Sequence, residues 1–118
     1  SSSIAERIGQ AWSHHRDGRH SEALAEFESI LRQNPDDIDA NYGVGLVQKA
    51  LNQVQAAETS FRKTLALVET ARKDYEAQRA ILHAHDNVKT PEDDRFTMLI
   101  RMINQRLSEI SGTAVTES

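Results

Sequence analysis

The chain has 118 residues, a formal net charge of -4 at pH 7 and no cysteine. The acidic balance argues against a nucleic-acid groove and against a polybasic membrane surface, and the lack of cysteine excludes a disulfide framework. No apolar run approaches the roughly 20 residues that a membrane-spanning helix needs. None resembles a signal peptide, so we expect a single soluble domain, by default in the cytoplasm.

The first two predicted helices are separated by a glycine turn. One runs from about 4 to 15, after a disordered start over 1–3, and Gly18 closes the turn behind it. The second runs from about Ser21, whose hydroxyl is a fair N-cap, to about Gln33. It ends at an Asn-Pro step, because the residue before a proline is pushed out of the α region.

Two more helices are predicted in the middle of the chain. Asp36 or Asp37 caps a third helix that reaches about Leu51, and a fourth covers about 54–68. The following segment, 69–85, is also helical in character, and it contains no glycine or proline. The sequence therefore leaves open whether a turn near its start separates a fifth helix or whether the two fuse into one.

The last predicted helix has a clear start signal after a loop over 87–91. Thr90 is a suitable N-cap, Pro91 occupies the first helical position, and the acidic run at 92–94 meets the positive end of the helix dipole. We expect this helix to end near Ser111. The polar tail over 112–118 is expected to be disordered.

The second and fourth predicted helices repeat each other at a spacing of 34 residues. Shifting one onto the other superimposes three apolar pairs, Ala23 with Ala57, Phe27 with Phe61, and Leu31 with Leu65. The same shift pairs Ala11 with Gly45 and Ser13 with Val47 in the first and third predicted helices. A helical hairpin cannot bury its own apolar face, whereas stacked copies bury it between them. The spacing therefore indicates a stack of helical hairpins.

The stretch from Ser21 to Leu31, followed by Asn34-Pro35-Asp36, resembles the second half of the tetratricopeptide repeat. Ala23, Phe27, Pro35 and the turn glycine Gly18 match this motif. The second copy departs from it at Asn52, where glycine is usual, and at Glu69, where proline is usual. The tryptophan position of the family's first helix holds Arg7 in one copy and Asn41 in the other.

The resemblance implies an all-α solenoid of about three antiparallel helix pairs, about six helices, in a right-handed stack. We expect one domain over 4–111, with hairpins at about 4–34, 37–69 and 70–111, the last degenerate and capping the stack. The residues expected to pack between repeats are Ala23, Phe27, Leu31, Gly45, Ala57, Phe61 and Leu65.

Tetratricopeptide arrays hold partners on the inner face formed by the first helix of each hairpin, and here the resemblance implies a partner-binding groove. Its predicted residues are Ile8, Trp12, His15, Tyr42, Leu46 and Lys49. The alternative is that the last helix covers these side chains, or that they pack against each other. The family's carboxylate clamp is not supported, because only Lys73 among the corresponding positions has the required chemistry.

No metal or cofactor site is predicted. His14, His15 and His20 surround the first turn, and His83 and His85 are two residues apart, whereas helical metal pairs favour a spacing of three or four. Nothing resembles a catalytic nucleophile or a phosphate-binding loop, so we do not expect an enzyme.

The sequence thus favours a protein-interaction module, a scaffold or adaptor, that binds a peptide or helix of unidentified origin. The alternative is a self-associating structural protein. It would use the last helix, whose apolar residues extend around more than one side. Those residues include Met98, Leu99, Met102 and Ile103.

Overall fold

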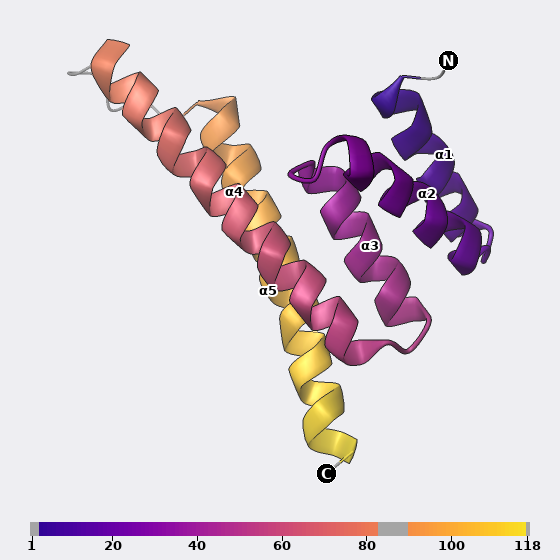
Figure 1. Ribbon diagram of the computed structural model, residues 1–118. Coiled ribbons are helices and arrows are strands. Elements are labelled where there is room, and N and C mark those ends of the chain that lie inside the picture. The colour runs from indigo at the N-terminus through magenta and orange to yellow at the C-terminus, as the bar shows by residue number, and fades with distance from the viewer. Residues whose placement is uncertain (1–2, 83–89, 118) are drawn as a thin grey trace. The chain divides into compact units, whose positions relative to one another are not determined.

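The computed structural model describes residues 3–82 and 90–117, which form five helices and no strand (Figure 1). The predicted all-α class is therefore confirmed. The chain divides into two compact units, Ser1–Thr64 and Leu65–Ser118. Their stacking as one domain over 4–111 stays a prediction. None of the helices in the described residues has an apolar stretch long enough to cross a bilayer.

The first unit contains α1 (Ile4–Arg16), α2 (His20–Gln33), α3 (Ile38–Ala50) and the beginning of α4 (Val54–Leu82). Within it, α2 packs against both α1 and α3 (Figure 1). Each helix is joined to the next by a short turn, as the predicted hairpins require.

The 34-residue repeat is present in the backbone of this unit. The helices α1 and α3 both have 13 residues and are offset by 34 positions, and so are the first residues of α2 and α4. Ser3 and Asp37, at equivalent positions, cap these helices by accepting a hydrogen bond from the backbone N–H three residues later, at 3.1 and 2.8 Å. The prediction for Asp37 is confirmed, and the Ser3 hydroxyl caps α1 in the same way.

The two turns of the repeat also share one geometry. Gly18 has φ of 80° and Asn52 has φ of 64°, both in the left-handed region. The backbone N–H after each donates to a carbonyl five residues earlier, from Arg19 to His14 and from Gln53 to Gln48, both at 2.8 Å. Asparagine tolerates this region better than most residues, so the departure at Asn52 preserves the turn.

The start of α2 differs from the prediction by two positions. The helix begins at His20, and Arg19 occupies the N-cap position without a side-chain hydrogen bond to the helix. Ser21 lies inside the first turn and is exposed, so it is not the N-cap. The local cause is the turn at Gly18. The turn closes at Arg19, whose backbone N–H donates to the His14 carbonyl, and the helix begins at the next residue.

Two phenylalanines one repeat apart form the centre of the first unit. Phe27 and Phe61 are fully buried, and their rings lie against Gly43 and Gly45 of α3. Residues two apart on a helix point roughly 200° apart, so the two rings contact nearly opposite sides of α3. The helix α3 is therefore packed between the Phe27 ring of α2 and the Phe61 ring of α4, as a stack of helical hairpins requires. Among the other packing residues, Ala23, Gly45 and Ala57 are buried, and Leu31 and Leu65 are half-buried.

The second unit contains the rest of α4 and α5 (Pro91–Glu117), which lie alongside each other (Figure 1). No turn interrupts α4 near 70–73, so the fourth and fifth predicted helices are one. Good helix formers and the absence of glycine and proline explain this continuity. Part of the predicted loop over 87–91 and both His83 and His85 fall outside the described residues.

The start of α5 is the one predicted. Thr90 precedes it, Pro91 is its first residue, and the backbone N–H of Asp93 donates to the Thr90 hydroxyl at 3.3 Å while the Thr90 N–H donates to the Asp93 carboxylate at 2.9 Å. Its end differs, because the helix continues to Glu117 instead of stopping near Ser111. The single glycine of this tail, Gly112, costs a helix only about 1 kcal/mol and does not end it.

Candidate partner-binding face

The six residues predicted to line the groove form two equivalent rows. Ile8, Trp12 and His15 are spaced by four and three residues along α1, and Tyr42, Leu46 and Lys49 have the same spacing along α3. Side chains at these intervals share one face of a helix. The rows are one repeat apart, so each position on α1 has its counterpart on α3.

Trp12 and Tyr42 join the two rows through their rings. The Trp12 ring lies 6.4 Å from that of Tyr42 and edge-on to that of Phe27 at 5.1 Å, and Tyr42 lies 5.7 Å from Phe61. Such ring pairs stabilise a fold by about 0.5–1.5 kcal/mol beyond the area they bury. Trp12 is half-buried, whereas Tyr42 is only 9% exposed. Tyr42 therefore belongs mainly to the core.

The remaining predicted residues are half-buried. Ile8 packs against the core cluster of the first unit, the His15 ring lies 6.1 Å from that of Trp12, and Leu46 and Lys49 follow Tyr42 along α3. The apolar and aromatic side chains thus leave part of their surface accessible. His15 stands at the C-terminal end of the row on α1, and Lys49 at the C-terminal end of the row on α3. Such a surface suits a partner segment with apolar anchors.

His15 also meets His20, a contact that helix spacing did not predict. The two Nδ1 atoms are 3.2 Å apart across the turn between α1 and α2. Burial lowers the pKa of His15, and the neighbouring His20 lowers it further. His14 points elsewhere, with its Nδ1 3.7 Å from the Glu22 carboxylate. Among the described residues, no three or more His, Asp or Glu side chains converge as metal ligands.

Arg7 has a structural role that the sequence analysis missed. Its side chain is 16% exposed, and it donates to three residues along α2, reaching Glu26 at 3.0 Å, Gln33 at 3.1 Å and the Ser29 hydroxyl. A guanidinium presents its donors in a planar fork and so can connect several acceptors. The spacing of these partners by three and four residues places them on one face of α2. That they accept hydrogen bonds from Arg7 follows only once α1 lies against α2.

Asn41, the counterpart of Arg7 in the second repeat, is also a polar connector. It is 3% exposed, and its Nδ2 donates to the carbonyls of Pro35 at 3.0 Å and Asp37 at 2.8 Å. These bonds secure the loop between α2 and α3. Arg7 therefore joins the two helices of the first hairpin, and Asn41 fixes the loop that leads to the second.

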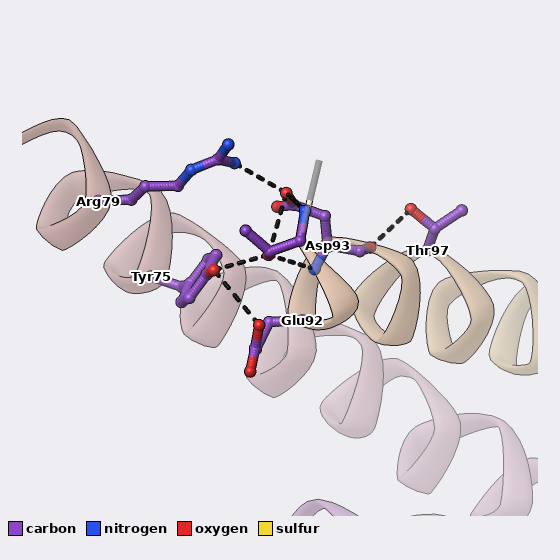
Figure 2. A network of polar contacts seen from close by, with 6 residues as sticks. Tyr75, Arg79, Glu92, Asp93 and Thr97 are labelled. Atoms are coloured by element: carbon purple, nitrogen blue, oxygen red, sulfur yellow. Dashed lines mark hydrogen bonds and ion pairs between the residues drawn. The ribbon is translucent and has the colours of Figure 1, made fainter. Parts of the chain in front are cut away.

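The acidic start of α5 is satisfied by its neighbours on α4. Figure 2 shows Tyr75 and Arg79 facing this helix end, with Arg79 donating to Asp93 at 2.8 Å and the Tyr75 hydroxyl 2.6 Å from that of Thr90. Backbone and side-chain hydrogen bonds from Thr90, together with Arg79, lower the pKa of Asp93. This network fixes the start of α5 on α4.

The fold resembles that of a solved structure. The solution NMR structure of a tetratricopeptide repeat domain protein from Salinibacter ruber matches with a TM-score of 0.54 and 20% sequence identity, covering 75% of this chain and 94% of that one. No model of a known protein family matches the sequence, and no curated protein matches it. At this identity the likeness concerns the fold alone, which is an all-α, solenoid-like arrangement of the tetratricopeptide type.

Proposed function

We propose that this chain, whose fold is of the tetratricopeptide type, is a protein-interaction module that binds a peptide or helix of another protein on the face formed by α1 and α3. The observation that carries the proposal is the pair of equivalent rows, joined by the contact between the half-buried ring of Trp12 and the ring of Tyr42. The role is one of binding, without a catalytic step.

The chemistry of the face indicates what the partner presents. Trp12 and Leu46 offer partly exposed aromatic and aliphatic surface, and His15 and Lys49 stand at the same end of their rows. A partner segment with two apolar side chains and an acidic residue beyond them would match this order. Aromatic anchors near the centre of an interface contribute most of its binding energy.

The test is a selection of peptides from a displayed random library against the full chain. Trp12 is the only tryptophan, so a peptide that binds this face changes its fluorescence. We expect Leu46→Lys to weaken the selected peptides on the order of tenfold or more, because it places a charge in the apolar part of the face. Tyr42 is left intact, since its truncation would damage the core.

The matched control is Ala25→Lys, which introduces the same charge at an exposed position of α2. It should leave both the affinity and the fluorescence change as in the wild type. Circular dichroism verifies that both variants remain helical. If Leu46→Lys and Ala25→Lys bind the selected peptides equally well, the α1–α3 face is not the binding surface.

A second candidate function is self-association through α5. Met98 is 53% exposed and Met102 is 38% exposed one helical turn later, whereas Ile103 is fully buried and Leu99 is half-buried. Sedimentation of the wild type over a range of concentrations tests it. The candidate is supported if the wild type associates, if Met98→Lys with Met102→Lys abolishes the association, and if the matched control Asn104→Lys with Gln105→Lys still associates. A concentration-independent monomer rejects it.

A further inference from the structure

The turn between α1 and α2 brings two imidazole rings into direct contact. His15 lies in the last turn of α1 and His20 is the first residue of α2, with ring centroids 5.1 Å apart and Nδ1 atoms 3.2 Å apart. Only one proton fits between the two nitrogens, so one ring donates and the other accepts. Neutral imidazole nitrogens are also the commonest protein ligands of transition metals.

The separation of the two nitrogens fits a single metal ion. Imidazole nitrogens bind zinc at about 2.0–2.1 Å. Two nitrogens at that distance from one ion, and 3.2 Å from each other, subtend an angle of roughly 100° at the ion. This value lies between those of square-planar and tetrahedral coordination. Binding requires each ring to turn so that its Nδ1 lone pair faces the ion instead of the other nitrogen.

The surroundings of the pair are compatible with a cation. The turn carries two arginines, Arg16 and Arg19, and two carboxylates, Asp17 and Glu22, so its formal charge is balanced. A divalent ion therefore meets no large net repulsion at this turn.

We propose that His15 and His20 form a two-imidazole site for a divalent transition-metal ion, with water completing the coordination. Each ring binds through Nδ1 with its proton on Nε2. The ring that donates through Nδ1 in the free pair first exchanges that proton with water and takes one up on Nε2, so a neutral pair takes up the ion with no net release of protons. The order of affinity follows ligand chemistry, with Cu²⁺ bound more tightly than Ni²⁺ or Zn²⁺.

The second repeat supplies a matched comparison within the same molecule. Its turn has the same backbone geometry, but Lys49 and Val54 stand at the positions of His15 and His20. His15→Lys with His20→Val therefore introduces side chains that an equivalent turn already accommodates. The folding of this variant is expected to be preserved, so that a loss of metal binding reports on the site itself.

The test is a titration of the full chain with Cu²⁺ near neutral pH, read by the fluorescence of Trp12. Its ring lies 6.1 Å from that of His15, close enough for a bound paramagnetic ion to quench it. We expect saturable quenching with one equivalent and at least tenfold weaker binding in His15→Lys with His20→Val. Electron paramagnetic resonance of the complex should show two nitrogen ligands.

Three controls make the result decisive. His14→Ala, and separately His83→Gln with His85→Gln, should leave the quenching of Trp12 unchanged. Lys49→His with Val54→His should add a second equivalent of bound Cu²⁺, since the geometry of the turn is already present. The proposal is overturned if His15→Lys with His20→Val binds as tightly as the wild type, if quenching does not saturate, or if the second turn gains no ion.

Discussion

Aromatic rings from the neighbouring helices fill the space where two glycines of α3 lack a side chain. A Cβ atom added at Gly45 would lie 2.6 Å from the Phe61 ring, and one added at Gly43 would overlap the Phe27 ring. Glycine inside a helix costs roughly 0.5–1 kcal/mol relative to alanine. Both glycines of α3 carry this cost, because a side chain at either position would clash with a phenylalanine ring.

Gly43→Ala is expected to destabilise the protein by about 1–3 kcal/mol. The new methyl group displaces the Phe27 ring, and the free energy this costs exceeds the gain in helix propensity. Its control is Gly9→Ala at the equivalent position of α1, where nothing lies within 4 Å of the added atom. That variant should gain roughly 0.5–1 kcal/mol. Urea unfolding measures both, and two variants of equal stability would contradict the ring contact.

The histidine pair predicts how stability depends on pH. The pKa of His15 in the folded chain lies below its ordinary value of 6.5, first through burial and then through His20. The unfolded chain therefore binds more protons as the pH falls, so the stabilisation is complete above about 6.5 and is lost below it. Thermal unfolding between about pH 7.5 and about pH 5 should show this decline.

In the same measurement, His15→Gln should flatten the decline, because glutamine does not titrate. His14→Gln is the comparison, since His14 lies on the same helix but faces Glu22. A decline that is identical in both variants and in the wild type would assign the pH dependence to other groups.

At the level of elements, the beginning of α5 is fixed both by its own cap and by side chains of α4. Thr90 and Asp93 exchange hydrogen bonds as N-cap and N3 residues, and Arg79 and Tyr75 of α4 bind the same two side chains. One local motif therefore also fixes which part of α4 lies beside the start of α5.

Thr90→Ala is expected to destabilise the protein by about 1 kcal/mol through loss of the cap.

Asp93→Asn should lower the stability of the protein more than Asp94→Asn does, because both residues lie in the first turn but only Asp93 pairs with Arg79. The folded-state pKa of Asp93 is lowered, so its stabilisation is present above the ordinary carboxyl value and disappears as the pH falls below it. Equal effects of the two substitutions at neutral pH would refute the pairing.

The elements were predictable where their signals are local. Asp37 and Thr90 as caps, Gly18 in its turn and Pro91 at a helix start each depend on a few consecutive residues. The continuity of α4 was left open because absence of a breaker permits a helix without requiring it. The Arg7 fork and the pairing of His15 with His20 were not predicted, because their partners meet only after α1 folds back on α2.

At the scale of the whole molecule, α4 belongs to both compact units. Its N-terminal part packs through Phe61 in the first unit, and its later turns carry Tyr75 and Arg79 of the second. Because the helix is uninterrupted, its backbone hydrogen bonds run through the boundary between the units. The two units are therefore expected to unfold together.

Thr70→Pro tests this coupling. Thr70 is exposed in the interior of α4, where proline costs about 3 kcal/mol or more by removing a hydrogen bond and clashing with the preceding turn. In the wild type, Trp12 fluorescence, which reports the first unit, and far-ultraviolet circular dichroism should give one coincident transition. In Thr70→Pro they should separate, and in Thr70→Ala they should not. Coincident transitions in all three proteins would contradict the coupling.

The exact offset between Ser3 and Asp37 has a consequence for engineering longer arrays. A duplicate of segment 3–36 inserted before residue 37 would join matching helix ends at both junctions, and its Gly9 already provides room for the incoming Phe27 ring. Three polar side chains would become interior in that copy. Their counterparts on α3 indicate the replacements, which are Glu6→Ala, Gln10→Val and Ser13→Val.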